Sequence, residues 1–310
     1  MLDVVRAPDL ARQPESRRWL VEGLWADQAV GIVGGEPKSF KSFLALDMAV
    51  AVASGRACLG RFETKRKGKV LLFAAEDALH IVRERLEGIA RAGGIDFGAL
   101  DVHVITNPTV RLDLKADRER LRETVQRLRP VLLVLDPFVR LHRVDENHAQ
   151  DVAPLLAYLR QLQRRHGTAV LLVHHARKGG HVRPGQALRG SSEFHAWGDS
   201  NLYLRRQRDR IVLTIEHRNA ASGEDLDLEL HAQDEAVELR VIEQPHGPKA
   251  EDPSATERVE TALRQASGPI DRRALRAACR MRMTTVIEAL GELSARGRIV
   301  KVAGGLELAP

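Results

Sequence analysis

Short apolar runs alternate with helix-like segments along the first part of the chain. The apolar runs predict strands at residues 29–33, 69–75, 102–106, 131–136 and 168–175. Between them, the spacing of apolar and polar positions predicts helices at 40–54, 78–92, 115–128 and 149–165. Because the strands are apolar on both faces and are connected by helices, they favour a parallel sheet that helices cover on both sides.

The pattern changes after residue 198. Short strands are predicted at 201–206, 210–217, 226–231 and 236–241, with connections as short as those of a meander. We expect these strands to extend the parallel sheet with antiparallel ones. The predicted fold class is therefore α/β, with a mostly parallel sheet, helices on both faces and an antiparallel extension.

The end of the chain is predicted to form a second, smaller domain. The segment EQPHGPKAEDPS at residues 243–254 is rich in proline and charge, and it predicts a linker between domains at 1–242 and 255–310. In the second domain we expect helices at 256–266, 272–280 and 284–295, then a hairpin of 298–302 and 306–308 that turns at Gly304 and Gly305.

Two further details of this small domain follow from its sequence. Ser254 and Glu257 predict a capping box on the first helix. The positions of the third helix expected to face the core are Val286, Ile287, Leu290 and Leu293. The order of elements resembles winged helix-turn-helix domains, which bind DNA; a winged helix that contacts protein is the alternative.

Composition and charge narrow the class of protein. Two cysteines, Cys58 and Cys279, are too few for a disulfide framework and favour a reducing compartment. No apolar stretch is long enough to span a bilayer, and the start of the chain lacks a secretory pattern, so we expect a cytoplasmic protein without a membrane partner. The net charge of +6 favours polyanionic partners, although a genome bias toward arginine explains it equally well.

The segment GEPKSFKS at residues 35–42 matches the phosphate-binding pattern G-x-x-x-x-G-K-[ST] at Gly35, Lys41 and Ser42, with Phe40 in place of the second glycine. A predicted strand precedes it and a helix follows, so backbone N–H groups and the helix N-terminus favour a bound phosphate. Lys41 is expected to neutralise the β- and γ-phosphate oxygens of ATP, and Ser42 to hold Mg²⁺. The predicted ATP-binding residues are Gly35, Glu36, Pro37, Lys38, Ser39, Phe40, Lys41, Ser42 and Phe43. The alternative is a glycine-containing turn with incidental lysines.

Acidic residues and histidines follow three of the predicted strands, at the sheet edge where ligands bind in such folds. Asp136 ends the strand at 131–136 and is predicted to lie in the Mg²⁺ shell; the alternative is a cap of the next turn. Glu76 is the candidate general base, and Asp77 the candidate cap of the following helix. His174 and His175 end a third strand and point to opposite sides, and His175 is favoured as the contact to the γ-phosphate.

The pieces GGEPKSFKS, LLFAAEDALHIVRERL, VLLVLDPFVRLHRVDEN, AVLLVHHARK and LRGSSEFHAWGD occur in order within residues 19–241. Together they resemble the RecA-like ATPases of the RepA type, which are plasmid- and phage-associated hexameric replicative helicases. The resemblance implies a RecA-like P-loop NTPase core that binds ATP and Mg²⁺, assembles as a homo-oligomeric ring, a hexamer, and acts on DNA. It implies a catalytic role for Glu76 and a Walker B role for Asp136. The matching loop residues are Asp145, Glu146 and Asn147, and Arg189 to Ser192 match a segment near the subunit interface or the DNA-facing loops.

The related DnaB-like helicases carry a Lys-x-Arg pair that acts on the nucleotide of a neighbouring subunit. In the stretch TIEHRNA, Arg218 matches the arginine, whereas Glu216 stands in place of the lysine. Three functions therefore stay open: a DNA-dependent motor, a non-motor ATP switch that binds DNA and recruits partners, and a DNA-binding regulator with a vestigial core. Glu76 and Asp136 argue against the third, while Phe40 and Glu216 keep the second open.

Arginines cluster in the second helix of the C-terminal domain and in the turn after it. They are Arg272, Arg273, Arg276, Arg280 and Arg282, and they are the candidate DNA-binding residues. The helix at 284–295, which would enter the major groove, carries two glutamates and few basic residues. We therefore expect phosphate contacts, with salt-sensitive and weakly sequence-specific binding.

Overall fold

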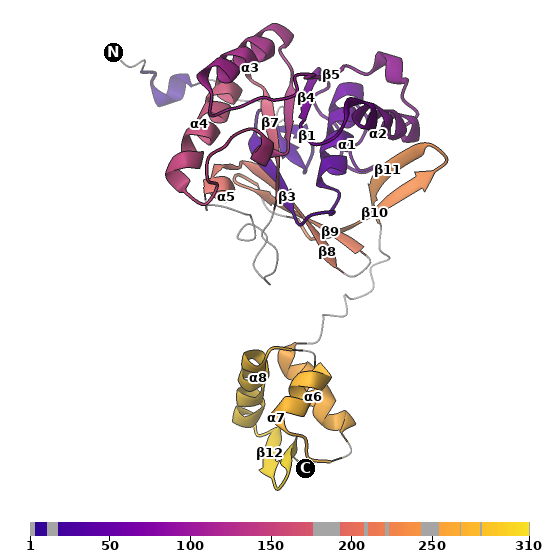
Figure 1. Cartoon of the computed structure of the whole chain (residues 1–310), viewed down its shortest axis with the longest axis vertical. Coiled ribbons are helices and arrows are strands. Elements are labelled where there is room, and N and C mark those ends of the chain that lie inside the picture. The colour runs from indigo at the N-terminus through magenta and orange to yellow at the C-terminus, as the bar shows by residue number, and fades with distance from the viewer. Residues whose placement is uncertain are drawn as a thin grey trace. The chain divides into compact units, whose positions relative to one another are not determined.

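The computed structural model describes residues 4–10, 18–175, 193–207, 210–220, 223–242, 254–266, 268–279 and 281–309. The chain divides into two compact units, Met1–Glu243 and Gln244–Pro310 (Figure 1). The linker predicted at residues 243–254 lies outside the described residues, apart from Ser254.

A nine-stranded sheet lies at the centre of the first unit, with the strand order β11-β10-β9-β8-β3-β7-β6-β4-β5. The strands are β3 (Val30–Gly35), β4 (Val70–Ala74), β5 (Val102–Val104), β6 (Leu132–Asp136), β7 (Ala169–His175), β8 (Ser200–Gln207), β9 (Arg210–His217), β10 (Leu226–Gln233) and β11 (Ala236–Val241). Neighbouring strands from β8 to β5 pair in parallel, and β9, β10 and β11 continue the sheet antiparallel. The predicted parallel sheet with an antiparallel extension is confirmed.

Helices cover both faces of this sheet (Figure 1). On one face lie α1 (Lys41–Ser54) and α2 (Leu79–Ala92); on the other lie α3 (Lys115–Leu128), α4 (Ala149–His166) and α5 (Glu193–Trp197). Because strand side chains alternate, Val33 of β3 packs in the first core, and Val30 and Ile32 pack in the second. Short 3-10 turns occur at Ala7–Asp9, Phe97–Ala99 and Phe138–Arg140.

A small antiparallel pair, β1 (Trp19–Val21) and β2 (Trp25–Ala26), precedes the sheet and was not predicted. Strands of three and two residues are too short to show an alternating pattern.

None of the helices in the described ranges has the length and apolar character that a membrane crossing requires. Cys58 and Cys279 are both buried free thiols.

The second unit packs α6 (Ala255–Gln265), α7 (Arg272–Cys279) and α8 (Met283–Ala295) with the hairpin β12 (Ile299–Val302) and β13 (Gly305–Leu308). The predicted capping box of Ser254 and Glu257 is present, with hydrogen bonds of 3.1 and 2.7 Å. Ile270 forms an isolated antiparallel bridge to Leu306 of the hairpin.

One predicted core position of the second unit is wrong. Val286, Leu290 and Leu293 are buried, as predicted, but Ile287 is 46% exposed. Successive helical residues are rotated by about 100°, so burying Val286 turns its neighbour toward solvent.

Candidate functional site

The loop between β3 and α1 lies at the carboxyl edge of the parallel sheet. Gly35 passes so close to β8 that a Cβ there would lie 2.3 Å from the carbonyl oxygen of Leu204, which leaves room only for glycine. Phe40 caps α1 with φ 63° and ψ 24°, in the left-handed region that glycine favours. Its ring packs against the hydrophobic core, so Phe40 adopts a glycine-like backbone while its side chain stays partly buried.

Lys41 is the first residue of α1, and it is only 5% exposed. Its Nζ donates a hydrogen bond of 2.6 Å to the carbonyl of Glu36, which also accepts a 2.8 Å bond from Ser39 Oγ. Burial lowers the pKa of Lys41 to about 8, against the opposing effect of nearby carboxylates, of which Asp136 is the strongest. A buried cation therefore lies directly beside the loop.

A cavity of about 580 Å³ opens between this loop and the ends of the neighbouring strands. Its lining residues are Lys38, Ser39, Phe40, Lys41, Ser42, Phe43, Ala74, Glu76, Asp77, Arg85, Asp136, His175, Arg206 and Leu230. The predicted residues from Lys38 to Phe43 thus share one cavity with Glu76, Asp136 and His175. The remaining predicted loop residues, Gly35, Glu36 and Pro37, precede this lining.

Asp136 ends β6 beside the start of α1, and the Ser42 hydroxyl forms a hydrogen bond with its carboxylate. Burial raises the pKa of Asp136 to about 6, although the bond from Ser42 opposes this shift. A hydroxyl and a carboxylate are oxygen donors that suit Mg²⁺. Within the described ranges no three His, Cys, Asp or Glu side chains group together as a metal site. An Mg²⁺ ion at Ser42 and Asp136 would therefore take its other ligands from phosphates and water, and the residues present fit a nucleotide that carries the metal.

The two acidic residues after β4 have different partners. Glu76 Oε1 accepts a hydrogen bond of 2.9 Å from Arg140 Nε, so its carboxylate is held at the cavity. Asp77 forms an ion pair with Arg85 of α2. The prediction that Asp77 caps this helix is wrong, because Ala78 occupies the N-cap position and provides no side-chain hydrogen bond.

The two histidines at the end of β7 lie on opposite sides of the sheet. His174 is buried and stacks on Phe194, with ring centroids 4.2 Å apart and an interplanar angle of 22°. His175 lines the cavity. The alternation of a strand explains this division, and it leaves His175 as the histidine beside the loop.

Arg218 lies away from the loop of its own chain. It forms a 3.0 Å ion pair with Asp199 and donates a hydrogen bond to the carbonyl of Ala196. Asp199 in turn accepts a 3.2 Å hydrogen bond from the N–H of Val30, the first residue of β3. The phosphate-binding loop follows the last residue of β3, so Arg218 and the loop lie at opposite ends of this strand. A hydrogen bond of 2.9 Å joins Glu216 to His195. The matched segment Arg189 to Ser192 lies outside the described residues.

Among the lining residues that were not predicted for this site are Arg206 of β8 and Leu230 of β10. The parallel register pairs Leu204 with Gly35, so Arg206 extends past the loop. Leu230 lies two strands farther along the sheet. The sequence indicates these two residues only weakly, since Arg206 is a basic residue near the end of one predicted strand and Leu230 is a leucine in another. The strand order is needed to bring them to the cavity.

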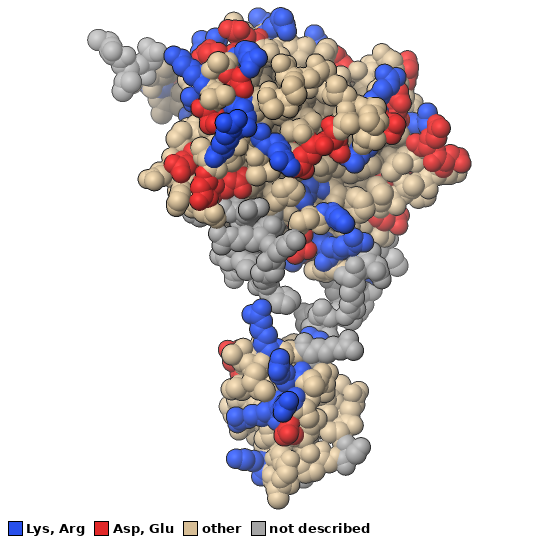
Figure 2. Space-filling model, in the orientation of Figure 1, with Lys and Arg blue, Asp and Glu red and all other residues tan. Residues whose placement is uncertain are grey.

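The predicted arginine cluster of the second unit is exposed where it is described. Arg272, Arg273 and Arg276 lie on α7, and Arg282 occupies the N-cap of α8. Arg280 lies outside the described residues. Figure 2 shows several basic side chains and few acidic ones on the visible face of this unit. No ion pair involves these four arginines in the part of the chain that the structure describes, whereas Arg298 of the hairpin pairs with Glu260.

The fold and the loop geometry define a P-loop NTPase with a RecA-like core. A family model described as "AAA domain" matches residues 1–181, and the chain belongs to this family of P-loop ATPase domains. No curated protein matches the chain. Among solved structures, the chain is similar to the KaiC-like protein PH0186 from the hyperthermophilic archaeon Pyrococcus horikoshii OT3, with a TM-score of 0.50 and 14% identity over 71% of this chain and 93% of that one. The predicted RecA-like fold is confirmed, and a P-loop ATPase domain implies the use of a nucleotide and Mg²⁺.

Proposed function

We propose that this chain is a DNA-dependent ATPase, a ring-forming helicase or translocase of the RepA type. One observation carries the proposal: a single cavity gathers Lys41, Ser42, Glu76 and Asp136. A cation, a hydroxyl beside a carboxylate and a separate carboxylate are the groups that ATP hydrolysis requires. The sequence resemblance to RepA-type helicases supports the action on DNA.

Each side chain has one part in this mechanism. Lys41 neutralises the β- and γ-phosphate oxygens, and Ser42 with Asp136 holds Mg²⁺. When bound, Mg²⁺ offsets the charge that develops on the phosphates. Glu76, held by Arg140 at 2.9 Å, orients the attacking water and accepts its proton. His175 contacts the γ-phosphate from the end of β7.

A ring of subunits supplies the remaining cation in this proposal. Because Arg218 is at the sheet end opposite to its own loop, it is unsuited to act within one chain. In a ring, Arg218 faces the nucleotide of a neighbouring subunit. There it leaves its ion pair with Asp199 and contacts the γ-phosphate of that nucleotide. A cationic finger of this kind stabilises the charge of the transition state.

The C-terminal unit binds duplex DNA as a winged helix in this account. Three helices, a hairpin and the bridge between Ile270 and Leu306 support that assignment. The exposed arginines on α7 and at the start of α8 would meet phosphates, which position a protein without reading sequence. Binding is therefore expected to be salt-sensitive and weakly sequence-specific.

A non-motor ATP switch is the second candidate, and two observations favour it. Phe40 replaces the glycine of the loop and keeps a left-handed backbone at φ 63°. Glu216 replaces the lysine of the finger pair and bonds to His195. Both departures fit a protein that binds ATP to recruit partners on DNA and turns it over slowly.

Strand separation distinguishes the two functions. The full chain is incubated with a forked DNA duplex, Mg²⁺ and ATP, and its mass in solution is measured under the same conditions. A motor separates the strands and has the mass of a ring. A switch binds the fork in an ATP-dependent manner and leaves the strands paired.

Removal of residues 250–310 tests the DNA-binding unit. Duplex affinity of the full chain and the truncation is measured at two salt concentrations, together with the basal ATPase rate. We expect weaker and less salt-dependent binding by the truncation, with hydrolysis largely retained. Equal affinities and equal salt slopes would assign the unit to protein contacts instead.

A further inference from the structure

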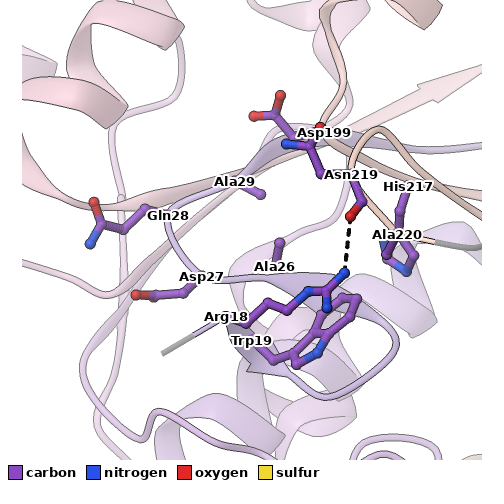
Figure 3. A pocket seen from close by; sticks show the side chains of 10 residues that line it. All are labelled: Arg18, Trp19, Ala26, Asp27, Gln28, Ala29, Asp199, His217, Asn219 and Ala220. Atoms are coloured by element: carbon purple, nitrogen blue, oxygen red, sulfur yellow. Dashed lines mark hydrogen bonds between the residues drawn. The ribbon is translucent and has the colours of Figure 1, made fainter. Parts of the chain in front are cut away.

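A second pocket lies at the end of β3 opposite to the phosphate-binding loop. It has a volume of about 510 Å³, which is in the range of small-ligand sites. Arg18, Trp19 and Asp27 line it from the β1–β2 region. Asp199, the residue before β8, and His217 of β9 line it from a later part of the sequence (Figure 3). None of the residues assigned to ATP contributes to it.

The pocket contains a preformed stack of a cation on an aromatic ring. The Arg18 guanidinium lies over the Trp19 ring, 5.5 Å from its centroid, and donates a 2.9 Å hydrogen bond to the carbonyl of Asn219. His217 meets the same ring edge-on, with centroids 4.9 Å apart. Nucleic-acid bases stack well on aromatic rings and on guanidinium planes.

The charge of the lining favours an anionic ligand. Asp27 pairs with Arg66 at 2.8 Å, and Asp199 pairs with Arg160, so guanidinium groups outside the lining offset both carboxylates. The positive charge of Arg18 is not offset by an acidic partner in the described ranges. The side-chain amides of Gln28 and Asn219 add donors and acceptors of the kind that pair with base edges.

We propose that this pocket binds a nucleotide, either free or as one unit of single-stranded DNA, with its base stacked on the Arg18–Trp19 pair. The site is separate from the loop, because the two lie at opposite ends of β3. Its occupation therefore does not depend on hydrolysis of ATP at Lys41.

Tryptophan fluorescence of the full chain provides the test, in a Lys41→Ala background that removes binding at the loop. The sequence has three tryptophans; Trp25 is fully buried and Trp197 is 9% exposed, so quenching by a ligand reports mainly on Trp19. The probes are AMP and a short oligothymidylate. We expect saturable quenching by at least one: AMP quenching indicates a free nucleotide, and quenching by the oligonucleotide alone indicates single-stranded DNA.

Two substitutions make the test specific to this pocket. Arg18→Ala should weaken binding by roughly tenfold or more. Trp19→Ala should weaken it to a similar extent, and because this substitution removes the fluorescent reporter, its affinity is measured by calorimetry. The matched control is Arg61→Ala, which removes an exposed guanidinium 5.9 Å from the Phe62 ring and outside this lining. Arg18 is exposed, so its truncation leaves the core intact. Absence of saturable binding, or equal affinity in the Arg18→Ala and Arg61→Ala proteins, overturns the proposal.

Discussion

Arg140 donates a hydrogen bond of 2.9 Å from Nε to the carboxylate of Glu76, and so links the end of β6 to the end of β4. This bond fixes the acidic group proposed as general base beside the loop. Arg140 lies in the short turn that follows β6, so the segment directly after Asp136 also holds Glu76.

Replacement of the base should separate binding from hydrolysis. Glu76→Gln should bind ATP with nearly unchanged affinity and lose about 10²–10⁴-fold in hydrolysis, since only the proton acceptor is removed. Single-turnover phosphate release and nucleotide affinity are the two measurements. Glu84→Gln, an exposed site on α2, is the control. A parental rate in Glu76→Gln would show that another group activates the water.

Phe40 holds a backbone conformation that glycine adopts without strain. Phe40→Gly relieves the left-handed strain and removes the ring from the core, so we expect nucleotide affinity to be kept or improved. Phe40→Ala is the matched variant, because it removes the ring but keeps a Cβ. Loss of binding in both proteins would mean that the ring itself builds the loop.

The proposed finger is tested by mixing two inactive proteins. Arg218→Ala should bind ATP normally and hydrolyse it several powers of ten more slowly. A mixture with Lys41→Ala should recover activity, since hybrid rings place an intact loop opposite an intact arginine. Arg210→Ala removes an arginine from the other end of β9, where it pairs with Asp227, and serves as the control. Unchanged hydrolysis in Arg218→Ala would exclude the finger role.

Much of the sheet and the loop was predictable from sequence, because the signals are local. Continuous apolar runs specify β4, β6 and β7, and strand alternation puts His174 and His175 on opposite sides. The ion pair of Asp77 with Arg85 was not predictable in this way, because an aspartate just before a helix is usually the N-cap residue of that helix. Arg206 reaches the cavity only through the register of β8 on β3, which no local pattern encodes.

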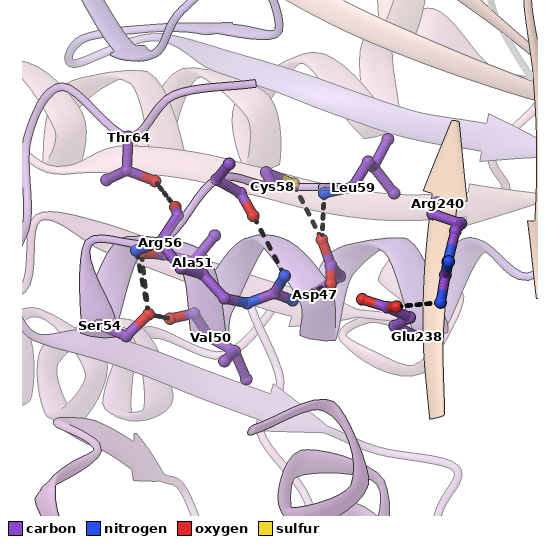
Figure 4. A network of polar contacts seen from close by, with 11 residues as sticks. Asp47, Val50, Ala51, Ser54, Arg56, Cys58, Leu59, Thr64, Glu238 and Arg240 are labelled. Atoms are coloured by element: carbon purple, nitrogen blue, oxygen red, sulfur yellow. Dashed lines mark hydrogen bonds and ion pairs between the residues drawn. The ribbon is translucent and has the colours of Figure 1, made fainter. Parts of the chain in front are cut away.

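A buried polar network links the middle of α1, the helix that follows the loop, to the segment after that helix (Figure 4). Asp47 of α1 is fully buried, pairs with Arg56, and accepts hydrogen bonds from the N–H of Leu59 at 2.8 Å and from Cys58 Sγ at 3.1 Å. Burial raises the pKa of the Cys58 thiol, so this cysteine stays protonated and unreactive.

Removal of this carboxylate should destabilise the first unit. Asp47→Ala leaves Arg56 without its partner, and we expect a loss of about 3–5 kcal/mol in the free energy of unfolding, which is typical of a broken buried ion pair. Denaturant unfolding measures it. Glu235→Ala removes an exposed ion pair with Arg91 and should leave the midpoint nearly unchanged. Equal midpoints for the two variants would contradict a structural role for the Asp47 network.

The rate of phosphate release from ATP, with and without single-stranded DNA, tests the central claim most directly. The full chain should hydrolyse ATP in the presence of Mg²⁺, and single-stranded DNA should raise that rate. Lys41→Ala should abolish hydrolysis in both conditions, because the buried charge on the phosphates is lost. A full-chain rate that equals the Lys41→Ala rate, or one that single-stranded DNA leaves unchanged, would contradict the assignment of a DNA-dependent ATPase.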